Sequence, residues 1–272
     1  MPTLSLSDVS LAYEHSGAGR DIVWLAAGDH PGRNWRLYQT PAFDSAYRST
    51  TYDARGVGTT VSETAPPWPI ETHAGDLAAL IEATCSPPVF LVGLSMGSLI
   101  AVQLAHDRAD LVRCAVVMGT CVRKTGFIRA WEQAEIDLRA RGETLPPDFA
   151  TAHYALLYYP AEVLGDDEAW ARVQPFVAAD FEQRDGAMLA AQWQACLDYD
   201  SSALLPRIRV PIHAVAFEQD VQTPPRRVRE VAALAADGHY HELAGCGHGS
   251  AFGHRPDLVN GCIASILGQY GQ

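Results

Sequence analysis

The chain has 272 residues, of which 48% are hydrophobic and 19% charged, with a formal net charge of -12 and an isoelectric point near 5.2. This composition can fill a core and excludes a mainly disordered chain. The longest apolar runs fall far short of the ~20 residues that a bilayer needs, so we expect no membrane span. An acidic surface repels phosphate backbones, which excludes nucleic acid as an expected partner.

The N-terminal stretch MPTLSLSDVS lacks a basic region followed by an apolar one, which predicts a cytoplasmic protein without a secretory signal. Six cysteines are scattered through the chain without CxxC spacing, so no zinc or redox motif is predicted. We expect no metal, no organic cofactor and a small molecule as the partner. The sequence leaves the oligomeric state open, a homo-oligomer included.

Short strands are expected at the start of the chain, before the pattern becomes regular. They lie at about 3–6, 11–14 and 22–26, and a helix at about 35–43 precedes a strand at 49–53. Helices over 70–84 and 98–106 then alternate with apolar runs at 89–92 and 114–118. Strands at 212–217 and 240–243 and helices at 226–236 and 256–267 close the chain. This alternation predicts an α/β fold with a mostly parallel sheet.

Between residues 123 and 205 the strand pattern disappears. Helices are expected there at 127–141, 148–159, 166–178 and 186–197. We therefore predict a core domain of residues 1–122 and 206–272 that carries a helical lid of residues 123–205. The lid is rich in aromatic residues, which favour an apolar or aromatic substrate, although aromatics at helical spacing are more often lid core. Arg123 and Arg129 could bind a substrate carboxylate, but solvated side chains are the more common outcome.

The strongest chemical signal is Gly93-Leu94-Ser95-Met96-Gly97, which fits G-x-S-x-G and lies between an expected strand and an expected helix. A serine at such a sharp turn has strained backbone angles, and side chains two positions away on either side would collide. Gly93 and Gly97 remove those side chains. A chance glycine-serine turn is the alternative, and the flanking strand and helix make it the minority interpretation.

A serine nucleophile needs a base that a third group orients, and in this setting the order is serine, acid, histidine. His248 fits the base because it follows the last expected strand in a glycine-rich loop, and His254 is the fallback. Asp220 fits the acid because it follows the preceding strand, and the neighbouring Glu218 could compete. The sequence therefore predicts a triad of Ser95, Asp220 and His248.

These segments together resemble the α/β-hydrolase superfamily over nearly the whole chain. Further similarity lies in Tyr52-Asp53-Ala54-Arg55-Gly56-Val57-Gly58, in the acid loop Gln219–Pro224 and in Gly247-His248 with the later Arg255-Pro256. The resemblance implies a mostly parallel eight-stranded sheet with a helical cap after strand six. The capped small-ester and lactone hydrolases are the most similar, including 3-oxoadipate enol-lactonase-like and haloperoxidase-like members.

The resemblance also implies an oxyanion hole built from backbone N–H groups. Met96 would supply one donor, and Gly28 matches the family's glycine after strand three, which makes the Asp29 N–H the second. The chain departs from the family here, since a carboxylate beside developing negative charge is unusual. We expect only the backbone of Asp29 to serve the site.

Three functions remain open at this point. The first is a serine hydrolase that cleaves an ester, lactone or thioester through an acyl-enzyme on Ser95. The second is non-hydrolytic chemistry on the same scaffold, by a lyase, a cyclase or a perhydrolase of haloperoxidase type. The third is a non-catalytic binding protein, which a complete serine, acid and histidine set disfavours.

Overall fold

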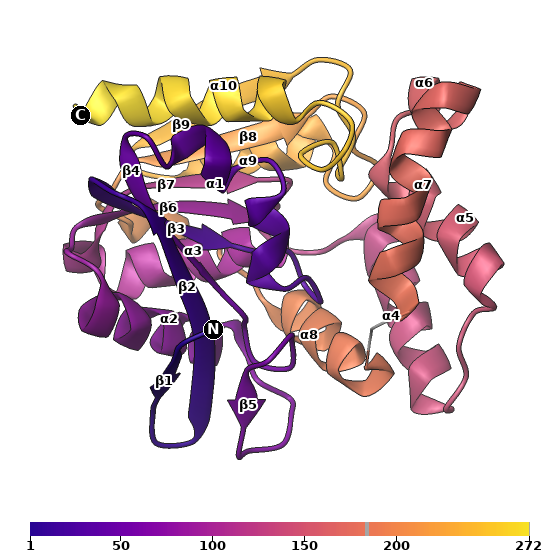
Figure 1. Ribbon diagram of the computed structural model, residues 1–272, viewed down its shortest axis with the longest axis horizontal. Coiled ribbons are helices and arrows are strands. Elements are labelled where there is room, and N and C mark those ends of the chain that lie inside the picture. Colours follow the sequence, from indigo (N-terminus) through magenta and orange to yellow (C-terminus); the bar gives the residue numbers. More distant parts are fainter. Residues whose placement is uncertain (183–184, 272) are drawn as a thin grey trace.

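The computed structural model describes residues 1–182 and 185–271. Within these residues a nine-stranded sheet forms the centre of the molecule, and its main path runs β1-β2-β4-β3-β6-β7-β8-β9 (Figure 1). The strands are β1 (Thr3–Ser5), β2 (Val9–Gly17), β3 (Arg20–Leu25), β4 (Tyr47–Tyr52), β5 (Val61–Ser62), β6 (Val89–Leu94), β7 (Val112–Met118), β8 (Ile212–Phe217) and β9 (Gly238–Leu243). The pairs from β4 across to β9 are parallel, and β2 pairs antiparallel with β1, β4 and β5.

The predicted mostly parallel α/β-hydrolase sheet is confirmed, with one addition. Eight strands lie on the main path, and β5 pairs only at the edge of β2. A strand of two residues is too short for alternation to be visible in the sequence, so it was not predicted.

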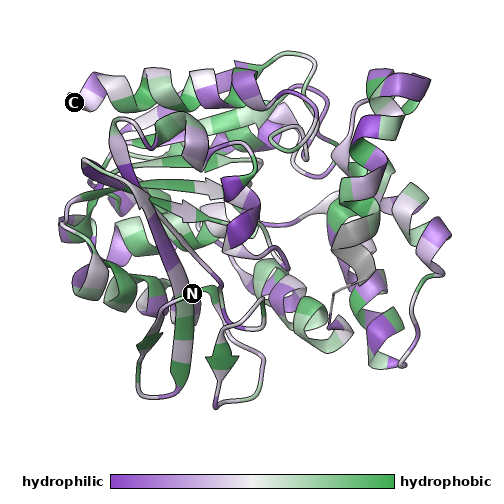
Figure 2. Cartoon of the chain, in the orientation of Figure 1, coloured by the Kyte–Doolittle hydropathy of each residue, from purple (hydrophilic) through white to green (hydrophobic). Residues whose placement is uncertain are grey.

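Helices cover both faces of the sheet. They are α1 (Thr40–Phe43), α2 (Ile70–Thr84), α3 (Met96–Asp107), α9 (Pro225–Leu234) and α10 (Pro256–Leu267). Val23 and Leu25 belong to the apolar cluster shared with α2, α3 and α9, whereas Ile22 and Trp24 belong to the one shared with α1 and α10. Since neighbouring residues of β3 enter opposite clusters, the strand is buried on both faces, as parallel strands usually are. Figure 2 shows hydrophobic colour on the central strands and both colours on the outer helices.

The predicted single helix over 35–43 is wrong. The chain instead forms a 3-10 turn at Gly32–Arg36 and then the one-turn helix α1. Pro41 lies in the first turn of α1, and a proline has no N–H and clashes with the preceding turn. A helix could therefore begin at this position but could not run through it.

In chain order a group of helices follows β7 and precedes β8. In Figure 1 it lies beside one end of the sheet. They are α4 (Gly126–Ala140), α5 (Pro147–Tyr158), α6 (Ala161–Leu164), α7 (Asp167–Glu182) and α8 (Gly186–Asp198). They share an apolar cluster that includes Tyr154, Val173 and Trp193. The exact division into core and lid at residues 123 and 205 stays a prediction. Among the described residues no helix combines the length and hydrophobicity that crossing a membrane requires.

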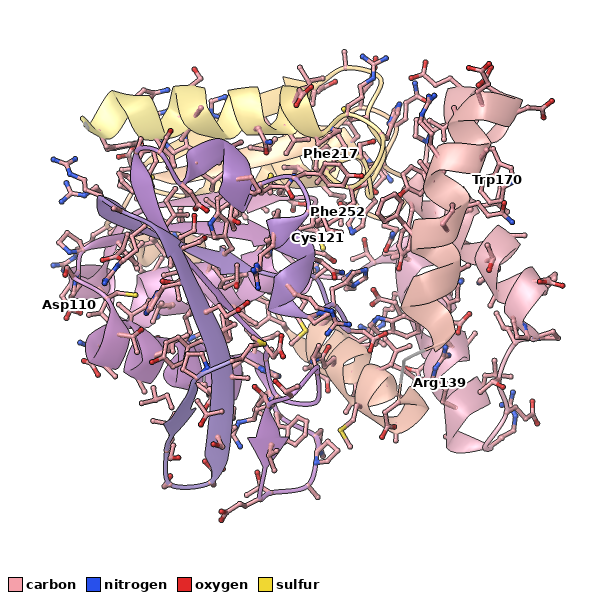
Figure 3. The ribbon with its side chains drawn as sticks, viewed as in Figure 1. Asp110, Cys121, Arg139, Trp170, Phe217 and Phe252 are labelled. Carbon is pink, nitrogen blue, oxygen red and sulfur yellow. The ribbon has the colours of Figure 1, made fainter. Side chains whose placement is uncertain are left out.

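The carboxyl ends of the parallel strands face this helical group. In Figure 3, Asp110, which precedes β7, lies at the far side of the sheet, and Cys121, which follows β7, lies on the side of the helices. Ligands of open α/β sheets bind outside the carboxyl ends of the strands. The loops after β3, β6, β7, β8 and β9 therefore meet where the helical group covers the sheet.

Candidate active site

Ser95 lies at the turn between β6 and α3. Its backbone has φ 53° and ψ −116°, in the left-handed range that residues with side chains rarely adopt. Two contacts with the end of β7 hold the turn, since the Ser95 N–H donates to Met118 O at 3.0 Å and the Met118 N–H donates to Ser98 Oγ at 3.0 Å. The neighbouring strand thus stabilises a turn that the local backbone disfavours.

The two motif glycines are required by close approach of other backbone. A Cβ on Gly93 would lie 2.6 Å from the carbonyl group of Gly97, and a Cβ on Gly97 would lie 2.2 Å from Leu25 O. Real Cβ atoms do not approach this closely, so larger residues at either position would move α3 or β3. The steric reason that the sequence suggested for these glycines is confirmed.

Asp220 and His248 form a buried pair on adjacent loops. Asp220 Oδ2 lies 2.6 Å from His248 Nδ1, and the two residues are 3% and 4% exposed. Thr223 Oγ1 donates to the same carboxylate oxygen at 2.7 Å, and the N–H groups of Gln222 and Thr223 donate to Oδ1 at 2.8 and 2.9 Å. Each of the two oxygens of the Asp220 carboxylate therefore has two hydrogen-bond partners.

This environment determines the charge of Asp220. Burial alone would raise its pKa, but the His248 imidazole and the hydrogen bonds from His248 and Thr223 outweigh burial and hold the pKa below its ordinary value. An ionised Asp220 accepts the Nδ1–H of His248 and so leaves Nε2 as the unprotonated nitrogen. That tautomer is the one that can take a proton from a serine.

The structure separates the two alternatives from this pair. Glu218 accepts the Gly245 N–H at 2.7 Å and joins the loops after β8 and β9 from the exposed side. His254 Nδ1 lies 2.9 Å from Ser250 Oγ, and the Gly247 N–H also donates to that oxygen at 2.8 Å. Both residues therefore bond to the loop that carries His248, and within the described residues neither forms a hydrogen bond with Asp220 or His248.

Ser95 and His248 lie in the wall of the same cavity, which has a volume of about 650 Å³. No hydrogen bond joins these two described residues, and catalytic hydrogen bonds often tighten only when substrate is bound. Aromatic side chains contribute much of the wall: Trp131, Tyr158, Tyr159, Phe176, Trp193 and Phe252. Phe252, labelled in Figure 3, lies between the sheet and the helical group. A cavity of this volume can hold a small molecule.

The two expected oxyanion donors, the N–H groups of Met96 and Asp29, have different surroundings in this structure. Met96 is the first residue of α3, and the N–H groups of a first turn have no partner inside their helix. The Asp29 N–H, in contrast, donates to Gln192 Oε1 of α8 at 2.5 Å, while Gln192 Nε2 donates to Arg55 O at 2.7 Å. Gly28 and Asp29 line the cavity. The Asp29 N–H can thus meet a substrate oxygen only after Gln192 Oε1 moves away, and its oxyanion role stays a prediction.

Sequence reasoning missed three polar residues of the helical group and its entry. Glu132 of α4 and Lys124 of the connection after β7 line the cavity, and Gln192 of α8 bonds the lining residue Asp29. Lys124 is the single lysine of the chain and follows the carboxyl end of a buried strand, which is the signal that could have indicated it. Arg123 instead faces outward, with a side chain 63% exposed, and Arg129 donates to Leu197 O at 3.2 Å.

Comparison with known proteins places the chain in a family. The family model described as "Alpha/beta hydrolase family" matches residues 17–261. The chain is 34% identical over 256 residues to a Mycobacterium tuberculosis protein named "Putative non-heme bromoperoxidase BpoC", with 93% of this chain and 95% of that protein covered. The crystal structure of BpoC from strain H37Rv matches with a TM-score of 0.90 over 96% of this chain and 97% of that one. The chain belongs to the alpha/beta hydrolase family.

Two further relatives carry names of hydrolases. A Caulobacter vibrioides protein named "Putative carbamate hydrolase RutD" is 27% identical over 262 residues, which cover 94% of this chain and 95% of that protein. The enol-lactonase from Burkholderia xenovorans LB400 shares the fold with a TM-score of 0.85 over 98% and 99% of the two chains, at 24% identity. The predicted family resemblance is confirmed, while these names describe those proteins and leave the substrate of this chain open.

Proposed function

We propose that the chain is a serine hydrolase that cleaves an ester, lactone or thioester of a small apolar or aromatic substrate. The observation that carries this proposal is the buried Asp220–His248 pair, joined at 2.6 Å, whose histidine lines the same cavity as Ser95 at its strained turn. A binding protein would have no use for an oriented imidazole and a serine at a strained turn in the wall of one cavity. The hydrolase names of RutD and the Burkholderia enol-lactonase are consistent with it.

The reaction would proceed in two halves. Ser95 Oγ attacks the carbonyl carbon while its proton passes to His248 Nε2, and Asp220 stabilises the resulting imidazolium. The oxyanion is received by the Met96 N–H and, once Gln192 Oε1 has moved, by the Asp29 N–H. His248 then returns the proton to the leaving oxygen or sulfur as the acyl-enzyme forms. Water, deprotonated by His248, attacks the acyl carbon and regenerates Ser95.

Non-hydrolytic chemistry on this scaffold is the second candidate, and the name of BpoC favours its perhydrolase form. In that reaction hydrogen peroxide replaces water as the attacking group, so the acyl-enzyme yields a peracid and free Ser95. Both candidates share the acyl-enzyme and differ in the second nucleophile. A lyase or cyclase would use His248 as a base without an acyl-enzyme.

The first test is labelling with a fluorophosphonate probe, followed by peptide mapping. We expect one modified residue, Ser95, and no label in Ser95→Ala protein. A panel of p-nitrophenyl esters of varied acyl length should then be run beside lactones and thioesters, with and without hydrogen peroxide. No labelling of fresh protein, or labelling at another residue, would contradict the proposed nucleophile. Turnover that depends on peroxide would select the perhydrolase.

A further inference from the structure

A buried ion pair lies in the cavity wall on the side of the helical group. Lys124 Nζ lies 2.7 Å from Glu132 Oε1, and the two side chains are 5% and 4% exposed. Both residues line the cavity that contains Ser95 and His248. The triad chemistry described above uses neither of them.

The pair has hydrogen-bonding capacity left over. Glu132 Oε2 is buried and has no hydrogen-bond partner within residues 1–182 and 185–271. An ammonium group has three N–H donors, and one suffices for the bond to Glu132 Oε1. Burial is the largest single influence and disfavours the ammonium form, but the charge and hydrogen bond of Glu132 together with the nearby Cys121 and Cys196 outweigh it and raise the pKa of Lys124 above its ordinary value. The lysine therefore stays a charged donor beside an incompletely bonded acceptor.

Packing of the helical group alone gives no reason for a buried ion pair at this position. A buried ion pair is often no more stabilising than apolar side chains of the same volume, because both charges lose their hydration. The neighbouring wall residues Trp131, Trp193 and Cys196 form a setting in which such apolar side chains would fit. A carboxylate oxygen without a partner adds a further cost, which a ligand could remove by donating a hydrogen bond.

We propose that Lys124 and Glu132 form a substrate-binding subsite for a neutral group that both donates and accepts hydrogen bonds, a hydroxyl or a carboxamide. The ammonium donates to the oxygen of this group, and Glu132 Oε2 accepts its O–H or N–H. The pair has no net charge, so an anionic group would meet the Glu132 carboxylate and a cationic group the Lys124 ammonium. The inference rests on the proposed function for the position of the reacting carbonyl at Ser95.

Matched esters test this subsite. The p-nitrophenyl esters of 3- and 4-(hydroxymethyl)benzoic acid differ from those of 3- and 4-ethylbenzoic acid by one hydroxyl in place of a methyl group. We expect kcat/KM of wild-type protein to favour at least one hydroxymethyl ester by about tenfold, the size of one good hydrogen bond. The variant Lys124→Met/Glu132→Leu removes both charges together, and the preference should disappear. Fluorophosphonate labelling of Ser95 in the double variant shows that the site is folded.

A second measurement leaves the ion pair intact. Because the chain has one lysine, protein labelled with ¹⁵N-lysine gives a single side-chain ammonium resonance, that of Lys124. In Ser95→Ala protein, methyl 4-(hydroxymethyl)benzoate or its 3-isomer should shift this resonance, whereas the matching ethylbenzoate should not. Quenching of tryptophan fluorescence reports that both esters bind, since Trp131 and Trp193 line the cavity.

The outcomes distinguish this subsite from the proposed function. Equal kcat/KM for both ester types, a hydroxymethyl preference that survives in the double variant, or binding without a shift of the Lys124 resonance would overturn the subsite. A stronger preference for 3- or 4-carboxybenzoate esters would also overturn it, in favour of an anion site. A selective shift of the Lys124 resonance without any Ser95 labelling or ester turnover would support the subsite and contradict the hydrolase.

Discussion

The strand ends and the helical group build one cavity, but they hold their polar groups in different ways. Asp220 receives two backbone N–H groups, and Ser95 is held by the backbone of β7. Among the described residues, Glu132 on α4 is held by the side chain of Lys124 alone, and Gln192 on α8 reaches across to the backbone of distant loops. Groups held by backbone keep their geometry when a neighbouring side chain changes, as reaction chemistry requires. Groups held by side chains can be substituted without a change in the sheet, which suits residues that determine the selectivity for substrate.

Substitution of the acid should give the largest effect and test the strand-end half of this comparison. We expect Asp220→Asn to lower kcat by roughly four orders of magnitude with little loss of stability, because the amide favours the wrong tautomer of His248. Steady-state ester hydrolysis measures it. The matched control is Glu218→Gln two residues earlier. The Glu218 carboxylate accepts the Gly245 N–H on the exposed side, so this variant should leave kcat within about threefold. Collapse of Glu218→Gln with a near-normal Asp220→Asn would reverse the assignment.

The Asp220 result depends on features that the sequence already displays. G-x-S-x-G lies between an apolar strand and a helix, and His248 and Asp220 follow later strands, so a parallel sheet must bring all three to one edge. The contact between Gln192 and Asp29 could not be predicted in this way. The two residues are 163 positions apart in the chain, and whether they come together depends on how α8 packs. The split of the expected helix at 35–43 and the short β5 likewise depend on local detail that periodicity does not resolve.

Removing one member of the buried pair should give the next largest effect, on stability. Lys124→Met leaves the Glu132 carboxylate buried without a countercharge, which typically costs about 3–5 kcal/mol in the free energy of unfolding. Urea denaturation at pH 7 measures the loss. Lys124→Met/Glu132→Leu should recover most of it, because no charge is then left buried. A single variant as stable as the double variant would show that water reaches the pair and would weaken the contrast between the two regions.

A smaller effect is expected where the two regions touch. Gln192→Leu removes the acceptor that now holds the Asp29 N–H, so the N–H becomes available to a substrate oxyanion. One hydrogen bond corresponds to at most about tenfold in rate, and we expect kcat for esters to rise severalfold. Gln194→Leu on the same helix is the control, since Gln194 forms an exposed hydrogen bond with Asp198 one turn later. A fall in kcat would mean that Gln192 positions the Gly28–Asp29 loop for catalysis rather than competing with substrate.

The smallest effect should come from Arg123, which is adjacent to Lys124 in sequence and opposite to it in environment. The Arg123 side chain is 63% exposed, and its nitrogen lies 3.6 Å from a carboxylate oxygen of Asp200, which is itself 42% exposed. Exposed pairs of this kind contribute about 0–1 kcal/mol, since water screens the charges and both long side chains lose freedom. Arg123→Met should therefore lower the free energy of unfolding by less than about 1 kcal/mol and leave kcat/KM for the matched benzoate esters within twofold.

Urea denaturation and the same ester series, run beside Lys124→Met, place the two neighbouring cations on one scale. If Arg123→Met instead changed the preference between hydroxymethyl and ethyl esters, selectivity would extend to the outer surface of the helical group, and burial in the cavity wall would no longer separate the residues that bind substrate from those that do not.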